Sequence, residues 1–247
     1  MQLKNKIAVI TGSSRGFGAV IAKTLHGYGT TVVITYLAGD ETEKHNAKRI
    51  GEETNADLIL PLDVCNRDSI KTMFKHVVDM YGNIDILVNN AGINRTADFD
   101  KQTDEEWDAV MDVDLKGVFR CCQEVLPYIN DSGRIINIGS VSGEYGGPRT
   151  PSYACAKAGI MSLTHNVARF VGHRNITVNC VSPGMIESEM LTETMSKNMQ
   201  QQLYKDVLLQ RLGNMNEVAE TVAFLSSEGA GYITAQTISV NGGLFVR

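Results

Sequence analysis

Residues 7–18 read IAVITGSSRGFG, and this stretch decides the predicted fold. The short apolar run at 7–11 is typical of a strand buried on both faces of a parallel sheet. Glycines follow at positions 12, 16 and 18, and apolar residues then recur at helical spacing, at Phe17, Val20, Ile21, Leu25 and Tyr28. The glycines are therefore predicted to lie at a strand-to-helix turn.

A turn of this kind is suited to binding an anion. Backbone without side chains lets a pyrophosphate approach a helix N-terminus, where free N–H groups and the helix dipole favour negative charge. A glycine-rich turn without a ligand fits the same letters, and the strand before and helix after favour the nucleotide interpretation. We expect a dinucleotide to contact Gly12, Ser13, Ser14, Arg15, Gly16, Phe17 and Gly18.

The alternation of strand and helix continues along the chain. Further strands are predicted at 32–35, 58–62, 84–88, 135–138, 177–182 and 237–240, and helices at 41–53, 69–80 and 218–226. No linker, repeat or low-complexity tract divides the sequence. This pattern predicts an α/β fold and a single nucleotide-binding domain over 1–247.

Composition excludes several classes of protein. The net charge of −5 gives no electrostatic footprint for nucleic acid or an anionic membrane. Five cysteines without a C-x-x-C pair argue against a disulfide framework and against a metal site. No apolar run approaches the roughly 20 residues of a membrane span. We expect a cytoplasmic protein without a bound metal.

The residues after the second strand bear on the choice of cofactor. Tyr36 and Leu37 stand where an acidic residue often holds a ribose 2′-hydroxyl and repels a 2′-phosphate. The nearest acids, Asp40 and Glu41, are interpreted as the start of a helix, where they suit its dipole. With Arg15 available as a phosphate partner, NADP(H) is favoured over NAD(H).

Later strand ends supply further candidates. Asp63, followed by Val64, could accept from an adenine amino group or could be a turn residue. In the Asn89–Gly92 run, Asn90 could brace neighbouring loops while Ala91 and Gly92 leave room for a flat ligand. After the sixth strand, the nicotinamide end is expected to meet Pro183, Gly184 and Ile186.

Tyr153 and Lys157 are the candidate catalytic pair. On a helix, residues four apart share a face, so the ammonium can approach the phenol. A free phenol has a pKa of about 10, and a nearby positive charge makes it a better acid near neutral pH. Such a group can protonate a developing alkoxide. Ser140, after the run at 135–138, would hold the substrate oxygen, although a lone Y-x-x-x-K also arises by chance.

Together these motifs resemble the short-chain dehydrogenase/reductase family. They are Thr11-Gly-x-x-x-Gly16-x-Gly18, Asn89-Asn-Ala-Gly92, Ser140, Tyr153-x-x-x-Lys157 and Ser182-Pro183-Gly184. Each is weak alone, but the set in this order is specific and covers essentially the whole chain. More narrowly, stretches such as 11–18, 135–140, 176–184, 186–190 and 232–237 are similar to the 3-oxoacyl-[acyl-carrier-protein] reductases of fatty-acid synthesis.

This resemblance implies a fold and an assembly. The fold would be a Rossmann-type, doubly wound sheet of seven parallel strands with helices on both faces. NADPH would be the hydride donor, and the chain would form a homotetramer with the segment through 242–243 at subunit contacts. Lys157 would also grip the nicotinamide ribose.

The chain departs from the family pattern at Asp114, where members usually carry Asn. The family's Asn is taken to hold, through its backbone, a water that links the lysine to solvent, and a carboxylate could keep that geometry. Its negative charge would oppose the effect of Lys157 on the phenol. We therefore predict a weaker enzyme or an alkaline-shifted pH–rate profile.

A second departure concerns docking of the acidic carrier protein. Arg174 matches one of two basic residues that related reductases present, but the other position falls at 130–132, where Asp131 would repel the carrier. A carrier-linked, coenzyme-A-linked or free ketone therefore stays open as substrate. The polar, Met-rich segment at 187–211 is predicted to be a substrate lid or an ordinary amphipathic helix pair.

Three functions follow from these residues. The first is NADPH-dependent reduction of a 3-oxoacyl thioester to the 3-hydroxyacyl thioester. The second is a related enzyme that acts on a sugar, a steroid or a small alcohol or ketone. The third, suggested only by Asp114, is a weakly catalytic nucleotide-binding partner subunit.

Overall fold

The structure is a computed structural model that describes residues 3–187 and 205–246. A seven-stranded sheet runs through it in the order β3-β2-β1-β4-β5-β6-β7, with every neighbouring pair parallel. The strands are β1 (Ile7–Ile10), β2 (Thr31–Tyr36), β3 (Ile59–Pro61), β4 (Ile84–Asn89), β5 (Ile129–Ile138), β6 (Thr177–Pro183) and β7 (Thr237–Val240). The predicted doubly wound α/β fold is confirmed.

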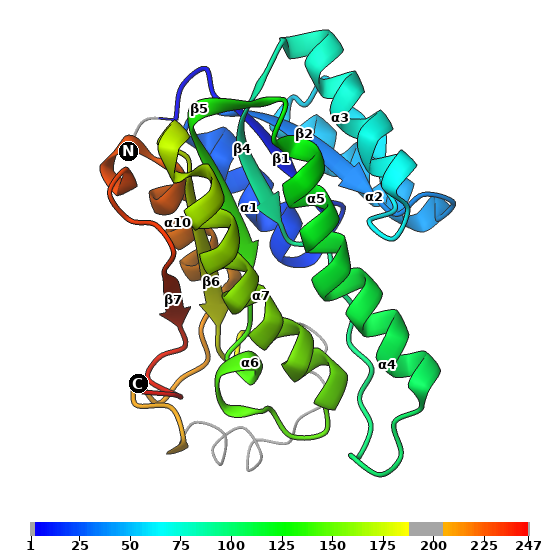
Figure 1. Cartoon of the computed structure of the whole chain (residues 1–247), viewed down its shortest axis with the longest axis vertical. Coiled ribbons are helices and arrows are strands. Elements are labelled where there is room, and N and C mark those ends of the chain that lie inside the picture. The colour runs from blue at the N-terminus through cyan, green and yellow to red at the C-terminus, as the bar shows by residue number, and fades with distance from the viewer. Residues whose placement is uncertain (1–2, 188–204, 247) are drawn as a thin grey trace.

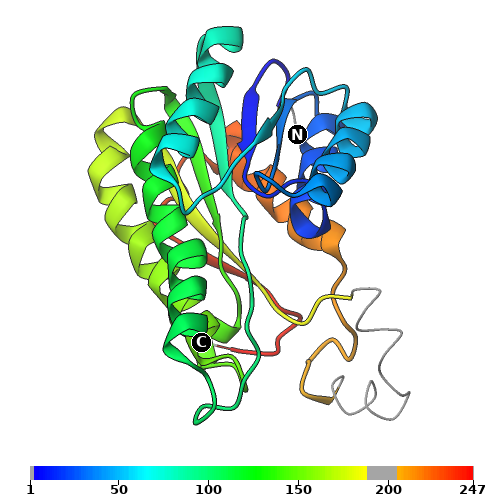
Figure 2. The same cartoon turned by 90° about the vertical axis from the view of Figure 1, so that its right-hand side faces the viewer.

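Helices cover both faces of the sheet (Figures 1 and 2). One face carries α1 (Gly16–Gly27), α2 (Glu41–Thr54) and α10 (Met215–Ser226). The other carries α3 (Arg67–Tyr81), α7 (Pro151–Val171) and a long rod made of α4 (Asp104–Val110), the π-helical segment η1 (Met111–Gly117) and α5 (Val118–Val125). Short turns complete the chain: α6 (Ser142–Tyr145), η2 (Gly172–Arg174) and η3 (Glu228–Ala230).

The apolar runs form the strands because both faces of this sheet are buried. Along β1, Val9 packs into the core beneath α3, α5 and α7, whereas Ala8 and Ile10 pack into the core beneath α1 and α10. All three side chains are fully buried. A strand with two buried faces needs a continuous apolar sequence rather than an alternating one.

Helix starts follow capping chemistry. Asp40 caps α2 by accepting from the N–H groups of Thr42 and Glu43. Asn66 caps α3 in the same way, so this helix begins two residues before the predicted start at 69. The short helix α6, between Ser140 and Tyr153, was not predicted, because four residues are too few for a periodic pattern.

The predicted lid lies mostly outside the described residues, since 188–204 are not among them. Residues 205–211 form turns in which Val207 is buried and its neighbours are exposed. No helix among the residues at 3–187 and 205–246 is long and apolar enough to cross a membrane.

Candidate active site

The glycine-rich loop after β1 is held from inside by Thr35 on β2. The Gly12 N–H donates to Thr35 Oγ1 at 2.9 Å, and the Ser13 N–H donates to the Thr35 carbonyl at 3.0 Å. The Ser13 hydroxyl donates to the carbonyl of Ile10 at 3.0 Å and is fully buried. Ser13 therefore supports the loop, and it lines neither of the two cavities described below.

The N-terminus of α1 is open toward this loop. Its N-cap residue, Arg15, makes no side-chain cap, and the first turn has no acidic residue. Gly16 has φ +56°, and nothing lies within 4 Å of where a Cβ would stand. Free N–H groups and an accessible backbone are what a pyrophosphate needs at a helix N-terminus.

Asn90 ties the loop after β4 to the loop after β1. Its amide group donates to the carbonyls of Thr11 and Gly12, each at 2.9 Å. In return, Thr11 Oγ1 accepts from the N–H groups of Asn90 and Ala91. β1 and β4 are neighbours where the strand order reverses, which is the point where open α/β sheets bind ligands.

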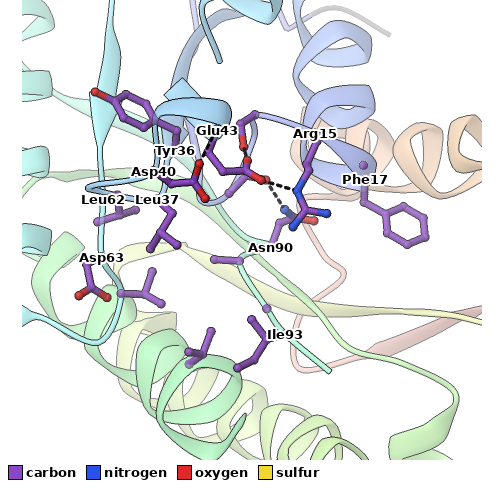
Figure 3. Close-up of a pocket in the computed structure, with 17 residues that line it drawn as sticks. Arg15, Phe17, Tyr36, Leu37, Asp40, Glu43, Leu62, Asp63, Asn90 and Ile93 are labelled. Atoms are coloured by element: carbon purple, nitrogen blue, oxygen red, sulfur yellow. Dashed lines mark hydrogen bonds and ion pairs between the residues drawn. The ribbon is translucent and has the colours of Figure 1, made fainter. Parts of the chain in front are cut away.

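Two cavities open along this edge of the sheet. One, of about 440 Å³, is lined from the glycine loop, the ends of β2 and β3, and the loop after β4 (Figure 3). The other, of about 260 Å³, lies at the ends of β5 and β6 beside α7. They share Phe17, Asn90, Gly92 and Ile93, so together they form one groove across the strand ends.

Most of the predicted cofactor residues line this groove. The larger cavity has Gly12, Ser14, Arg15, Gly16, Phe17, Leu37, Asp63, Val64, Asn90, Ala91 and Gly92. The smaller has Tyr153, Lys157, Pro183 and Gly184 in addition to the shared residues. Gly18 and Ile186 line neither cavity. Gly18 packs against Gly12 and Asn90, and Ile186 pairs with Gly213 in an isolated bridge.

The catalytic candidates meet in the smaller cavity. Tyr153 and Lys157 lie on the first turns of α7, and Nζ of Lys157 is 5.3 Å from the centre of the Tyr153 ring. Ser140 follows the end of β5, and its Oγ accepts from the Ser142 N–H at 3.1 Å. That contact leaves the Ser140 hydroxyl proton able to donate into the cavity.

Lys157 is buried and held by two groups. Nζ donates to the Ile138 carbonyl at 3.0 Å and lies 3.1 Å from Oδ2 of Asp114. Burial alone lowers the pKa of the ammonium, but the charges of Tyr153 and Asp114 outweigh burial, and the pKa of Lys157 is raised. Lys157 is therefore a fixed cation beside the phenol.

Asp114 acts on Lys157 through its side chain. Oδ1 accepts from the Ile93 N–H at 2.7 Å, and the side chain has no exposed surface. Burial raises the pKa of Asp114, opposed by the charge of Lys157 and the bond from Ile93. The contacts of Asp114 at this site come from its side chain, and no spacing in the sequence indicated this direct ion pair.

Arg15 is paired with a carboxylate through one of its guanidinium nitrogens. Its Nε lies 2.6 Å from Oε1 of Glu43, and the Ser14 hydroxyl donates to the other oxygen of the same carboxylate (Figure 3). The sequence analysis interpreted Asp40 and Glu41 only as acidic residues that suit the dipole at the start of a helix, and it missed Glu43. The spacing Asp40-x-x-Glu43 is a capping signal, and it could have drawn attention to this residue.

Glu144, which was not predicted, lies near the site, and Asp63 lies in it. Glu144 on α6 accepts from Ser182 at 2.5 Å and from Ser239 at 3.1 Å, so it ties α6 to the ends of β6 and β7. Asp63 lines the larger cavity and also accepts from the Cys65 N–H at 2.8 Å. Both interpretations of Asp63, turn residue and cavity residue, are therefore compatible with its position.

Arg174 lies at the opposite edge of the sheet. Its Nε is 2.7 Å from Oδ1 of Asp131, and its other nitrogens donate to the carbonyls of Leu126 and Ile129. The guanidinium is thus tied to its own chain, on a surface remote from the groove.

Comparison with known proteins supports this geometry. A family model described as enoyl-(acyl carrier protein) reductase matches residues 12–245. The 3-oxoacyl-[acyl-carrier-protein] reductase FabG of Staphylococcus epidermidis is 40% identical over 98% of this chain and 100% of its own length. The FabG of Thermotoga maritima is 39% identical, with both chains fully covered.

Solved structures also include similar proteins that match nearly the whole chain. A mutant short-chain dehydrogenase/reductase of Serratia marcescens superimposes with a TM-score of 0.89 at 33% identity, covering 99% of both chains. A blue fluorescent protein from a metagenomic library, solved in complex with NADPH, has a TM-score of 0.91 at 29% identity over the whole of both chains.

Proposed function

Because this chain belongs to the short-chain dehydrogenase/reductase family, we propose that it reduces a 3-oxoacyl thioester to the 3-hydroxyacyl thioester with NADPH, as in fatty-acid synthesis. The FabG relatives support this substrate class, since they match over nearly their full length. The observation that carries the proposal is the placement of Lys157 Nζ 5.3 Å from the Tyr153 ring inside the smaller cavity.

The groove has the features that a nicotinamide dinucleotide needs. The open N-terminus of α1 and the bare backbone at Gly16 would receive the pyrophosphate. The larger cavity would hold the adenosine end, and the smaller cavity, lined by Pro183 and Gly184, the nicotinamide end. When bound, the cofactor supplies the hydride.

The protein's own residues supply the proton and hold the substrate. Ser140 donates a hydrogen bond to the carbonyl oxygen of the substrate, which fixes its position beside Tyr153. Tyr153 then gives its proton to that oxygen as negative charge develops there. Lys157 makes the phenol a better proton donor by electrostatics, and an N–H group of its ammonium that is not used by Ile138 or Asp114 would donate to the ribose of the nicotinamide end.

Replacing Tyr153 with Phe tests this assignment. The change removes the proton donor but keeps the ring over Lys157, so we expect loss of at least about a hundredfold in kcat with acetoacetyl-CoA. Binding of reduced cofactor, followed by its fluorescence, should change little. Tyr81→Phe, on α3 outside both cavities, is the matched control. Full activity of Tyr153→Phe would refute the mechanism.

The same assay separates the competing functions. A panel of acetoacetyl-CoA, its carrier-linked form, sugars, steroids and small ketones distinguishes a thioester reductase from another oxidoreductase of the family. Tight cofactor binding without turnover of any ketone would support the partner-subunit alternative. The choice of NADPH is supported by Tyr36 and Leu37 at the end of β2, which leave that strand end without an acidic residue.

Further parts of the proposal concern partners and location. A homotetramer is supported by exposed aromatic residues on three helices, Phe119, Phe170 and Phe224, and light scattering measures it directly. Five free thiols favour the cytoplasm. The segment 187–211 would act as the lid of the substrate site within one domain, 1–247. An acidic carrier would dock through Arg174 once the guanidinium is released from Asp131.

A further inference from the structure

The larger cavity contains an ion pair that the mechanism does not use. Glu43, in the first turn of α2, accepts from Arg15 Nε at 2.6 Å and from the Ser14 hydroxyl (Figure 3). Its side chain is 15% exposed, whereas that of Arg15 is 76% exposed. The carboxylate is therefore set into the cavity wall, and the guanidinium reaches over it from the rim.

The position of Glu43 coincides with the ribose end of the groove. It lines the cavity together with Tyr36 and Leu37, the residues at the end of β2. This is the place where dinucleotide-binding folds put the acidic residue that binds a ribose 2′-hydroxyl. β2 ends without such a residue. The first turn of α2, which Asp40 caps, instead places the carboxylate of Glu43 beside the end of β2.

The charges around this end of the cavity are mostly negative. Of the described residues that line it, Arg15 is the one basic side chain, whereas Asp40, Glu43 and Asp63 are acidic. A 2′-phosphate needs the guanidinium as its partner, and must share it with Glu43, which holds Nε, while lying beside that carboxylate. A 2′-hydroxyl needs no cation, and it can donate to a carboxylate that still has lone pairs to accept with.

We propose that Glu43 is a specificity-determining residue, which lowers the preference of this site for NADPH over NADH by holding Arg15 and by standing beside the 2′ position. The inference rests on the proposed nicotinamide-dependent function and concerns the same groove. The end of β2 has no acidic residue, which by itself would favour NADPH over NADH. Glu43 makes the affinities for the two cofactors more similar.

The test is binding of both reduced cofactors to the full chain and to Glu43→Gln. Glutamine keeps the size and one acceptor oxygen but removes the charge. We expect the ratio of the NADH Kd to the NADPH Kd to rise about tenfold, mainly through tighter NADPH binding. Adenosine 2′,5′-bisphosphate and 5′-AMP, which lack the nicotinamide, should show the same change in ratio by calorimetry.

Glu41→Gln is the matched control. Glu41 lies in the same turn of α2 and pairs with Lys44, but it does not line the cavity. It removes the same charge from the protein, so its ratio should stay at the wild-type value. An unchanged ratio in Glu43→Gln, or an equal rise in Glu41→Gln, would overturn the proposal.

An Arg15→Ala background tests whether Glu43 acts on cofactor preference by holding Arg15. If Glu43 acts by holding the guanidinium, adding Glu43→Gln to Arg15→Ala should raise the ratio by much less than tenfold. An equal rise would show that capture of Arg15 is not involved. Binding of the nucleotides without reduction of any thioester would sink the proposed function but leave the role of Glu43 standing. Binding of neither nucleotide would overturn both.

Discussion

At the scale of single residues, the ion pair of Asp114 and Lys157 is the buried charge pair of the candidate site. Nζ and Oδ2 are 3.1 Å apart, and both side chains are almost fully buried. Asp114 is one of the charges that raise the pKa of Lys157. The same carboxylate partly cancels the field that Lys157 exerts on the Tyr153 phenol. Asp114 therefore keeps the Lys157 ammonium charged, but it also weakens the electrostatic effect of that ammonium on the Tyr153 phenol.

Asp114→Asn should change the pH dependence of catalysis. The variant removes a group that raises the pKa of Lys157, so this pKa falls, and the phenol experiences the full charge of the ammonium. We expect the pH–rate profile to move to lower pH by roughly one unit, with a higher kcat near neutrality. The measurement is kcat against pH with acetoacetyl-CoA.

Asp112→Asn is the control for this change. Asp112 lies on the same π-helical segment but pairs with Lys116 and Arg120, outside the smaller cavity. If Asp114→Asn leaves both kcat and the profile as they are in the wild type, the ion pair does not tune the phenol.

The same pair has a consequence for stability. Since the pKa of Lys157 is raised in the folded chain, the ammonium contributes stability below the ordinary value of 10.5, and this contribution is lost as pH rises through the higher folded pKa. Removing one partner of a buried ion pair typically costs about 3–5 kcal/mol. Asp114→Ala should therefore destabilise far more than Asp114→Asn, which can still accept from the Ile93 N–H.

At the scale of secondary-structure elements, the site depends on close approach of α1 to the loops after β1 and β4. A Cβ on Gly18 would stand 2.3 Å from the Gly12 carbonyl and 2.6 Å from the Asn90 amide nitrogen. The segment η1 shows a similar closeness, because a Cβ on Gly117 would lie 2.9 Å from Val64. Such contacts bring strand ends and helices near enough to form one groove.

Gly18→Ala should disrupt this contact. The added methyl forces the start of α1 away from Asn90, at a cost of about 1–3 kcal/mol of stability, and cofactor affinity should fall with it. Gly27→Ala is the control in the same helix, since nothing lies within 4 Å of its Cβ position. Thermal unfolding and cofactor fluorescence measure both effects. Wild-type stability and affinity in Gly18→Ala would contradict the packing argument.

At the scale of the whole molecule, the carboxyl ends and the amino ends of the strands carry different surface features. The carboxyl ends of the strands carry the groove, whereas Arg174 and Asp131 lie near the amino ends of β5 and β6. Asp131 is 75% exposed and holds the Arg174 guanidinium at 2.7 Å. An acidic carrier would compete with this carboxylate for the cation.

Asp131→Asn should therefore favour carrier-linked substrate. The change removes a repulsive charge and the ion pair at Nε of Arg174, so kcat/KM for acetoacetyl carrier protein should rise severalfold, mainly through KM. The value for acetoacetyl-CoA is the internal control and should stay constant, because the groove is remote. Equal effects on the two substrates would exclude docking at this surface.

The sequence by itself determined the fold and the proximity of the candidate catalytic pair. Buried parallel strands need continuous apolar runs, and a helix places residues four apart on one face, so 7–11, Tyr153 and Lys157 were readable from local pattern. Only the tertiary structure decided what surrounds them. Glu43 meets Arg15 across 28 positions of sequence because β1 and β2, which precede them, are neighbours in the sheet. Asp114 meets Lys157 across 43 positions because η1 packs against α7. Contacts between distant segments leave no periodic pattern in the sequence. The effect of a charged side chain also depends on which charge lies opposite it in the folded protein.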